Sequence, residues 1–378
     1  MKRASDAFDL TPVIDLDTCK PPPKTEMSTP DMSYPYRTTD PYGVTRSIEP
    51  RGVLPQQAWQ LDPSLPLAED EIEILVECLN IDSASFIQIA ESANQNPDKI
   101  IETIKTTIKT RGKQHNPVTS SGGMLLGSVG RIGPKYPNAV LNLKPGDKIA
   151  SLVSLSLTPL ELDQVLGLNL SAHQLKVRGR AFLFASSPLA KIPSDLSESM
   201  VLSALDVCGA PGQAARMVKP NQDVAVLGGG GKSGVLILYQ AKLKGARTLA
   251  VEYSARAAEK LKAYSFIDQV IVADATQAVT CSNLVKSVYP KGADLVFNCA
   301  NVSETEMATI LSTKEGGQAY FFSMATSFSR AALGAEGLGA DVTLIMGNGF
   351  VPGHSELTLQ SLRDSKELYD YFAAHSGV

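Results

Sequence analysis

Three glycines with the spacing Gly-x-Gly-x-x-Gly follow an apolar run and open a helix-like segment. They are Gly229, Gly231 and Gly234, and the apolar run ends at Leu227. At this spacing the first glycine lets the chain turn out of a strand, the second lets backbone N–H groups approach a pyrophosphate, and the third lets helix and strand pack closely. The helix would direct the positive end of its dipole at that anion. The pattern therefore predicts a dinucleotide-binding turn.

An acidic residue lies where such a turn would bind the adenosine ribose. Glu252 ends the next apolar run, and a carboxylate there favours NAD because it accepts hydrogen bonds from the ribose hydroxyls. Arg256 follows closely and keeps NADP open as a cofactor. A purely structural glycine turn and a nucleotide-binding methyltransferase are the alternatives, although the full spacing to Gly234 argues against the methyltransferase.

Further cofactor contacts are expected after the predicted strands, because ligands bind at the carboxyl ends of strands in open α/β sheets. Asn298, Cys299 and Ala300 would line the nicotinamide region, with Cys299 as a small packing residue rather than a nucleophile. Asp274 would border the adenine unless it only caps a loop. The complete predicted cofactor site comprises Gly229, Gly230, Gly231, Lys232, Ser233, Gly234, Glu252, Tyr253, Arg256, Asp274, Asn298, Cys299 and Ala300.

The elements that would position these residues alternate between strand and helix from Asp223 onward. Short apolar runs of this kind are typical of buried parallel strands, so the pattern predicts a doubly wound α/β domain. The helix after the glycines should span 232–244, and a final helix should span 357–372. The predicted strands are 223–227, 248–252, 269–272, 294–298, 318–322 and 342–346.

The preceding part of the chain is rich in short extended segments and turns. Residues 71–80 alternate polar and apolar, residues 121–133 are punctuated by glycines, and Lys144-Pro145-Gly146-Asp147 sets a turn into a strand. Such a series predicts a β-rich, barrel-like domain. The domains are predicted as a mobile tail (1–40), this β-rich domain (41–200), the dinucleotide-binding domain (201–350) and a C-terminal helical segment (351–378).

The composition is that of an ordinary globular protein of 378 residues. The net charge of −4 gives no electrostatic case for a nucleic-acid or anionic-membrane partner, and no apolar run is long enough to span a membrane. The five cysteines lack C-x-x-C spacing, which argues against a zinc lobe and a disulfide scaffold. The N-terminus lacks the core of a signal peptide, so a reducing, cytoplasmic setting is expected.

The order of these features resembles the medium-chain dehydrogenase/reductase superfamily. Lys144-Pro145-Gly146-Asp147, Ala190-Lys191-Ile192-Pro193 and the late glycine turn carry the resemblance. It implies a GroES-like catalytic domain followed by a Rossmann domain, and a homodimer. Zinc-dependent members carry a cysteine ligand where this chain has Asp82, and Gly-His-Glu where it has Gly122-Gly123-Met124. A catalytic zinc needs three protein ligands, so no metal is expected.

Four blocks resemble a narrower family, the L-erythro-3,5-diaminohexanoate dehydrogenases. The resemblance implies NAD(P)-dependent oxidative deamination at C3 of the diamino acid, giving 5-amino-3-oxohexanoate and ammonia in lysine fermentation. A zinc-independent, NADPH-dependent quinone or enoyl reductase and a non-enzymatic cofactor-binding protein are the alternatives. The blocks are RSIEPRGVLPQ (46–56), LNIDSASF (79–86), ALDVCGAP (204–211) and GNGFVPGH (347–354).

A diamino acid substrate requires carboxylates for its two ammonium groups and a cation for its carboxylate. Asp82 stands where the superfamily places a reactive-centre ligand, and it is predicted as an ammonium anchor or base, with a helix cap as the alternative. Asp206 lies in an apolar run where an isolated carboxylate is costly, and it is predicted as the second ammonium partner or base, with an interdomain hydrogen bond as the alternative.

Three more residues are candidates from their positions in loops. Glu49 and Arg51 flank a proline, and Arg51 could bind the substrate carboxylate, although an exposed surface pair is the alternative. His354 follows the last predicted strand in a glycine-rich loop and could relay protons near neutral pH, with a structural role as the alternative.

Overall fold

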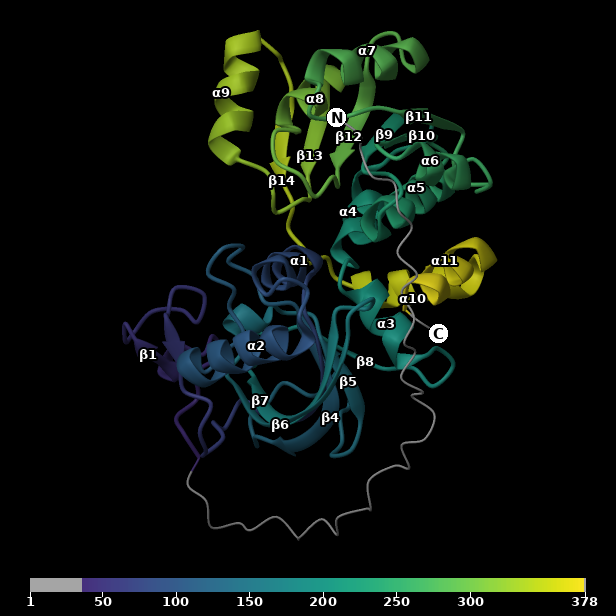
Figure 1. The fold of residues 1–378 in the computed structure, drawn as a ribbon. Helices are drawn as coiled ribbons and strands as arrows, with labels where there is room; N and C mark the ends of the chain where they lie inside the picture. The colour runs from purple at the N-terminus through teal and green to yellow at the C-terminus, as the bar shows by residue number, and fades with distance from the viewer. Residues whose placement is uncertain (1–35, 377–378) are drawn as a thin grey trace. The chain divides into compact units, whose positions relative to one another are not determined.

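The computed structural model describes residues 36–376, which belong to one compact unit (Figure 1). Most of the predicted tail, residues 1–40, lies outside the described residues. Within the described part, no helix is long and apolar enough to cross a membrane.

The N-terminal half of the unit is built on an antiparallel sheet of six strands in the order β6-β7-β3-β4-β5-β8. The predicted strands at 71–80 and 121–133 correspond to β3 and β4, which pair with each other. The elements of this half are η2 (Val44–Arg46), β1 (Ser47–Glu49), β2 (Gln60–Leu61), β3 (Ile72–Asn80), α1 (Ser83–Ser92), α2 (Pro97–Arg111), β4 (Met124–Ile132), β5 (Lys148–Ser151), η3 (Leu155–Leu157), β6 (Leu160–Asn169), β7 (Gln174–Leu183) and β8 (Leu189–Lys191).

A buried ion pair joins the start of this half to its sheet. The side chain of Arg46 is fully buried and donates from Nη2 to Glu71 Oε2 (2.6 Å) and from Nε to Oε1 (2.9 Å). Its guanidinium also donates to the carbonyls of Asp62 and Pro66 and lies 4.0 Å from the ring centre of Phe182. Because both charges are buried, the packing here depends on their remaining paired.

The second half contains a parallel sheet of six strands in the order β11-β10-β9-β12-β13-β14 (Figure 1). The chain reverses its direction across the sheet between β9 and β12, which is where doubly wound sheets bind ligands. This confirms the predicted α/β fold class. The elements are β9 (Asp223–Leu227), α5 (Lys232–Leu243), β10 (Arg247–Glu252), α6 (Ala255–Leu261), β11 (Gln269–Val272), α7 (Ala278–Val288), β12 (Ala293–Asn298), α8 (Glu306–Ser312), β13 (Thr313–Phe321), α9 (Phe328–Leu338) and β14 (Thr343–Met346).

Four helices link the two sheets: α3 (Glu198–Leu205), α4 (Gly209–Met217), α10 (His354–Asp364) and α11 (Lys366–Ser376). Helix α10 packs against α3 and α4, and α11 against α3 and α5 (Figure 1). The prediction of a single helix over 357–372 was wrong, because the chain breaks at Ser365. This residue is extended, and its hydroxyl accepts a hydrogen bond from the Leu368 N–H, so that α11 starts with its own cap.

Candidate functional site

The glycine that turns the chain out of β9 lies one residue earlier than the spacing predicted. Gly228 has φ of +74°, in the left-handed region that favours glycine, so it makes the sharp turn that was assigned to Gly229. A Cβ on Gly229 would lie 2.9 Å from the Cβ of Ala250, so Gly229 instead allows close packing against β10. A Cβ on Gly234 would lie 2.5 Å from the Gly228 carbonyl oxygen, which matches the packing role expected of the third glycine.

The start of α5 is open in the way that a phosphate requires. A Cβ on Gly231 would meet only the Gly228 carbonyl oxygen, at 3.6 Å, and no side chain caps the helix at this end. The first N–H groups of a helix have no intrahelical acceptor, so an anion can bind them. Ser233 lies in this first turn, half-buried. The backbone at this turn therefore fits the pyrophosphate of a dinucleotide.

Glu252 ends β10 directly beside this turn. Its Oε2 accepts a hydrogen bond from the Gly230 N–H (3.0 Å), and its Oε1 accepts one from the Ser254 N–H (3.2 Å). Tyr253 and Arg256 follow it on the surface, both exposed. The carboxylate is therefore held at the turn in the position expected of a ribose-binding acid.

The other predicted cofactor residues lie at strand ends but are already partnered. The Asn298 amide is fully buried and donates to the hydroxyls of Thr305 and Thr309. Burial raises the pKa of the Cys299 thiol to about 12, which fits a packing residue rather than a nucleophile. Ala300 lies against the turn, since a Cβ on Gly228 would be 2.8 Å from its nitrogen.

Asp274 stands at the end of β11, where its carboxylate accepts hydrogen bonds from the Thr276 N–H (2.9 Å) and hydroxyl (2.7 Å). These two hydrogen bonds lower the pKa of Asp274. The loop-capping alternative therefore describes the contacts that this residue makes, and its place beside the adenine stays a prediction.

Asp82 follows β3 and caps α1 with only one of its carboxylate oxygens. Oδ1 accepts a hydrogen bond from the Ser85 N–H (2.9 Å). Oδ2 is buried and has no hydrogen-bond partner among the described residues. A buried carboxylate oxygen without a donor is costly, so it is suited to receive one from a bound cation.

Asp206 follows α3 and faces both Asp82 and the first residue of α5. Its Oδ2 lies 3.7 Å from Lys232 Nζ, an ion pair too long for a direct hydrogen bond. Burial raises the pKa of Asp206, the Lys232 charge opposes that rise, and the Asp82 charge adds to it. The three charged groups are therefore close enough to influence one another.

Asn80 completes the surroundings of Asp206 and was not predicted. Its side-chain amide lies near the Asp206 carboxyl and lowers the pKa of that group. Its Oδ1 accepts from Gln174 Nε2 (3.1 Å), and Gln174 Oε1 accepts from the Ser199 hydroxyl (3.2 Å). This chain of hydrogen bonds fixes the orientation of the Asn80 amide. Its one sequence signal was its place in the block 79–86, two residues before Asp82.

His173 lies close enough to Asp82 and Lys232 for their charges to affect it, and no sequence feature predicted this. It lies in the turn between β6 and β7, and its ring stacks on Phe86 of α1 with 4.4 Å between ring centres. Burial lowers the pKa of His173, the Lys232 charge lowers it further, and the Asp82 charge raises it. We call Asn80, Asp82, His173, Asp206 and Lys232 the carboxylate cluster.

The structure does not bring the remaining candidates into this cluster. Glu49 and Arg51 are exposed beside β1, and neither forms an ion pair within residues 36–376. His354 is buried at the start of α10, where its ring packs edge-on against Phe350 (5.2 Å between centres). Burial lowers the pKa of His354. The roles proposed for these three residues stay predictions.

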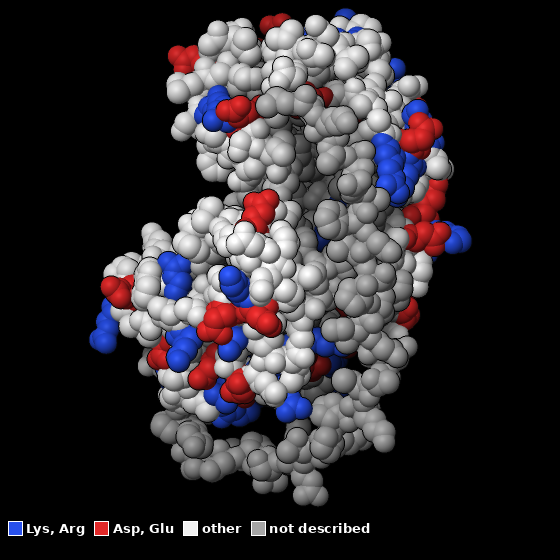
Figure 2. All heavy atoms as spheres, viewed as in Figure 1, with Lys and Arg blue, Asp and Glu red and all other residues white. Residues whose placement is uncertain are grey.

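The described residues contain no group of three His, Cys, Asp or Glu side chains that could hold a metal ion. On the face drawn in Figure 2, acidic and basic side chains are interspersed, and no continuous basic patch is visible among the coloured residues.

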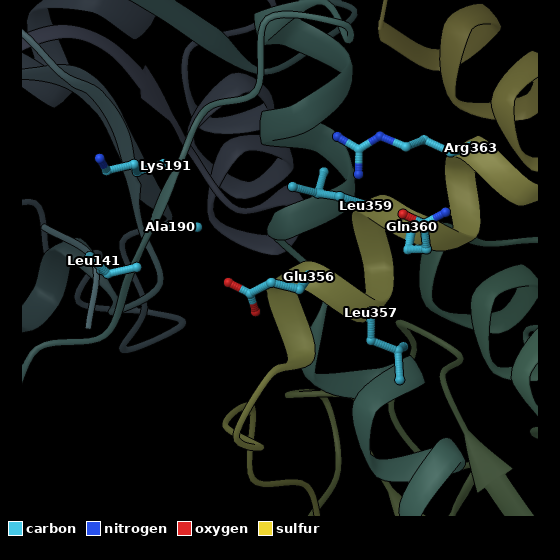
Figure 3. A pocket seen from close by; sticks show the side chains of 8 residues that line it. All are labelled: Leu141, Ala190, Lys191, Glu356, Leu357, Leu359, Gln360 and Arg363. Atoms are coloured by element: carbon cyan, nitrogen blue, oxygen red, sulfur yellow. The ribbon is translucent and has the colours of Figure 1, made fainter. Parts of the chain in front are cut away.

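An open hollow of about 620 Å³ lies beside α10 (Figure 3), and no residue of the carboxylate cluster lines it. Its two cationic side chains are already paired, since Lys191 contacts Asp147 (2.9 Å) and Arg363 contacts Asp195 (2.7 Å). None of the predicted site residues lines it, so we do not assign the reaction to it. Its lining residues are Leu141, Ala190, Lys191, Glu356, Leu357, Leu359, Gln360 and Arg363.

Comparison with known proteins identifies the family. A family model for the N-terminal domain of L-erythro-3,5-diaminohexanoate dehydrogenase matches residues 45–193. The L-erythro-3,5-diaminohexanoate dehydrogenase of Acetoanaerobium sticklandii is 45% identical over 329 residues, covering 86% of this chain and 95% of the relative. The chain belongs to the L-erythro-3,5-diaminohexanoate dehydrogenase family. A second dehydrogenase of this family, from Fusobacterium nucleatum, is 46% identical over 335 residues, covering 88% of this chain and 97% of the relative.

This family membership confirms the resemblance based on the four sequence blocks. A solved structure of a mycobacterial quinone oxidoreductase is similar with a TM-score of 0.52 and 19% identity, covering 88% of this chain and 93% of that protein. At this identity the likeness concerns the fold alone, and it agrees with the predicted GroES-like and Rossmann architecture.

Proposed function

We propose that this protein is a nicotinamide-dependent dehydrogenase that removes the C3 amino group of L-erythro-3,5-diaminohexanoate by oxidation. Its two relatives bear that name and match nearly their whole length, which makes it an oxidoreductase acting on an amino group. The balanced reaction converts the diamino acid, water and oxidised cofactor to 5-amino-3-oxohexanoate, ammonium, reduced cofactor and a proton. The reaction belongs to the fermentation of lysine.

The observation that supports this proposal best is the pair of carboxylates Asp82 and Asp206. One has a buried oxygen without a partner, and the other is mostly buried beside a loosely paired lysine. Two carboxylates with unfilled hydrogen-bonding capacity suit a substrate that carries two ammonium groups. A quinone or an enoyl thioester carries no cation, so the quinone or enoyl reductase alternative is not favoured. Nor is a non-enzymatic role.

The chemistry begins with a proton transfer that Asp206 is placed to perform. Asp206 contacts Lys232, which directly follows the glycine turn, so we place the C3 ammonium at Asp206 and the C5 ammonium at Asp82. Ionised Asp206 accepts a proton from the C3 ammonium, which leaves a neutral amine that can become an imine. A nicotinamide dinucleotide held by the glycine turn and Glu252 would supply the hydride acceptor for C3.

The same carboxylate can serve the hydrolysis of the imine. Once Asp206 has released the proton of the C3 ammonium to solvent, it can accept a proton from the water that attacks C3 and return that proton to the departing ammonia. The Lys232 charge favours the ionised form of Asp206 before each proton transfer, and Asn80 keeps the carboxylate oriented. Asp82 holds the other end of the substrate throughout, so that C3 stays in place.

We also propose NAD as the preferred cofactor. Both oxygens of the Glu252 carboxylate accept backbone N–H groups, which keeps its negative charge at the turn. A ribose hydroxyl can donate to this carboxylate, whereas a 2′-phosphate would be repelled by it. A cytoplasmic location and a homodimer are proposed as well, the first from the cysteine pattern and the second from the superfamily resemblance.

The assignment of Asp82 can be tested with two substrates that differ in one amino group. We expect Asp82→Asn to lower kcat/KM for 3,5-diaminohexanoate by about 10- to 100-fold, since a charged hydrogen-bond partner is lost. Asparagine preserves the helix cap, so the fold should be unaffected. The variant should act almost as well as the wild type on 3-aminohexanoate, which lacks the C5 ammonium. An equal loss on both substrates would contradict the assignment.

A further inference from the structure

We propose that the C-terminal helix α11 forms part of the dinucleotide site, with Tyr371 as a positioning residue for the glycine turn. The inference rests on the proposed function only in that the turn binds a nicotinamide dinucleotide. No role was predicted for this helix, which the sequence indicated only as the end of a final helix over 357–372.

The contact that supports the inference is a hydrogen bond between the two segments. The Tyr371 hydroxyl donates to the Gly230 carbonyl oxygen at 2.9 Å. On its other side, Gly230 donates its N–H to Glu252 Oε2 at 3.0 Å. Gly230 is therefore held at both of its backbone polar groups, by the C-terminal helix and by the ribose-binding acid.

Holding Gly230 orients the backbone that meets the phosphate. Its carbonyl shares a peptide plane with the N–H of Gly231, which donates to the Gly228 carbonyl (3.2 Å) and so closes the turn directly before the open start of α5. Glycine restricts its own backbone less than any other residue, so a turn of four successive glycines needs outside contacts to keep one conformation. A site that is ordered before its ligand arrives binds that ligand more tightly.

The helix itself is anchored firmly enough to do this. Glu367 accepts hydrogen bonds from the Ser265 N–H and hydroxyl, both at 2.8 Å. Leu368 and Phe372 are fully buried on the inner face of α11. The Tyr371 ring is 8% exposed and stacks on His375, with 4.1 Å between ring centres. A phenol hydroxyl buried in this way needs a partner, and Gly230 provides it.

The test is the affinity of the full-length protein for NADH, measured by nicotinamide fluorescence without substrate. We expect Tyr371→Phe to raise the Kd for NADH by about 3- to 10-fold, the effect of losing one hydrogen bond that orders the site. The matched control is Tyr369→Phe on the same helix, because the Tyr369 side chain is 41% exposed. The control should bind NADH as the wild type does.

Hydrogen exchange gives a second readout that does not depend on a variant. Because coupling between sites is reciprocal, NADH should slow amide exchange in α11 of the wild type as well as in the glycine turn. Unchanged Kd in Tyr371→Phe, or no protection of α11 by NADH, would overturn the inference while leaving the dehydrogenase proposal standing. A wild type that bound neither NADH nor NADPH would overturn both.

Discussion

At the scale of single residues, Asp82 has two carboxylate oxygens in different surroundings. Its Oδ1 caps α1, while its Oδ2 is buried without a partner among the residues described. The superfamily position of Asp82 predicted an ammonium anchor, and an aspartate ahead of a helix predicted a cap. Oδ1 makes the cap, and the proposed ammonium anchor would use Oδ2. A variant that keeps the cap but removes the charge can therefore separate the two roles.

We expect replacement of the Asp206 carboxylate by a neutral amide to lower activity while raising the stability of the fold. Burial raises the pKa of Asp206 when the chain folds, so the folded protein holds this proton more tightly than the unfolded chain does. The stability linked to the proton is present below the unfolded pKa and is lost as pH rises through the folded pKa. Asp206→Asn should lower kcat at least ~100-fold and raise the Tm at pH 7, with the gain in Tm disappearing below about pH 4.

Asp274 provides a control because its pKa is shifted in the opposite direction from that of Asp206. Its hydrogen bonds to Thr276 lower its pKa, so the linked stability is present above the unfolded pKa and is lost as pH falls through the folded pKa. Asp274→Asn should thus be slightly less stable than the wild type at pH 7 and equal to it in acid. A Tm of Asp206→Asn below that of the wild type at pH 7 would contradict the account of Asp206.

Some site residues could be predicted from the sequence and others could not. Asp206 stood out because a carboxylate in an apolar run needs a reason to be there. His173 gave no such signal, since a histidine in a turn is ordinary, and its place in the cluster follows only from the packing of its turn against α1. Gly228 was passed over because the Gly-x-Gly-x-x-Gly spacing begins at Gly229, and only the φ of +74° at Gly228 shows that the preceding glycine makes the turn.

At the scale of elements, the strands of the parallel sheet were the most predictable feature. Their boundaries follow from short apolar runs, and predicted strands 223–227 and 269–272 coincide with β9 and β11. The break between α10 and α11 was not predictable in this way, because Ser365 is neither proline nor glycine. Leu362 and Leu368 are both buried on either side of it, so tertiary packing turns the chain there.

The buried pair of Arg46 and Glu71 should dominate the stability of the N-terminal half. Arg46→Met would leave the Glu71 carboxylate buried with only the Ala68 N–H as donor. We expect a loss of about 3–5 kcal/mol in the free energy of unfolding, the usual effect of leaving a buried charge unpaired. Denaturant unfolding monitored by circular dichroism would measure it.

The matched control is the exposed pair of Lys105 and Glu102 on α2, whose side chains are 49% and 67% exposed. Lys105→Met should change the free energy of unfolding by less than ~1 kcal/mol, because solvent screens such pairs. Similar losses in the two variants would show that burial does not set the energetic importance of the Arg46 pair.

At the scale of the whole molecule, the carboxylate cluster is assembled from segments far apart in the chain. Asp82 follows a strand of the antiparallel sheet, Asp206 follows α3, and Lys232 opens a helix of the parallel sheet. The proposed substrate comes from the family resemblance, whereas the closeness of these three side chains is seen only in the fold. A quinone oxidoreductase with 19% identity has a similar fold, and a fold alone does not determine the reaction, so the proposed chemistry is argued from these side chains.

The measurement that tests the central claim most directly is product stoichiometry with L-erythro-3,5-diaminohexanoate. Cofactor reduction and ammonia release would be followed together, with NAD and NADP in separate reactions and a metal chelator present. We expect one ammonia for each reduced cofactor, a higher kcat/KM with NAD, and no effect of the chelator. Reduction of neither cofactor, from protein shown to bind NADH, would contradict the assignment of this chain as an amino-acid dehydrogenase.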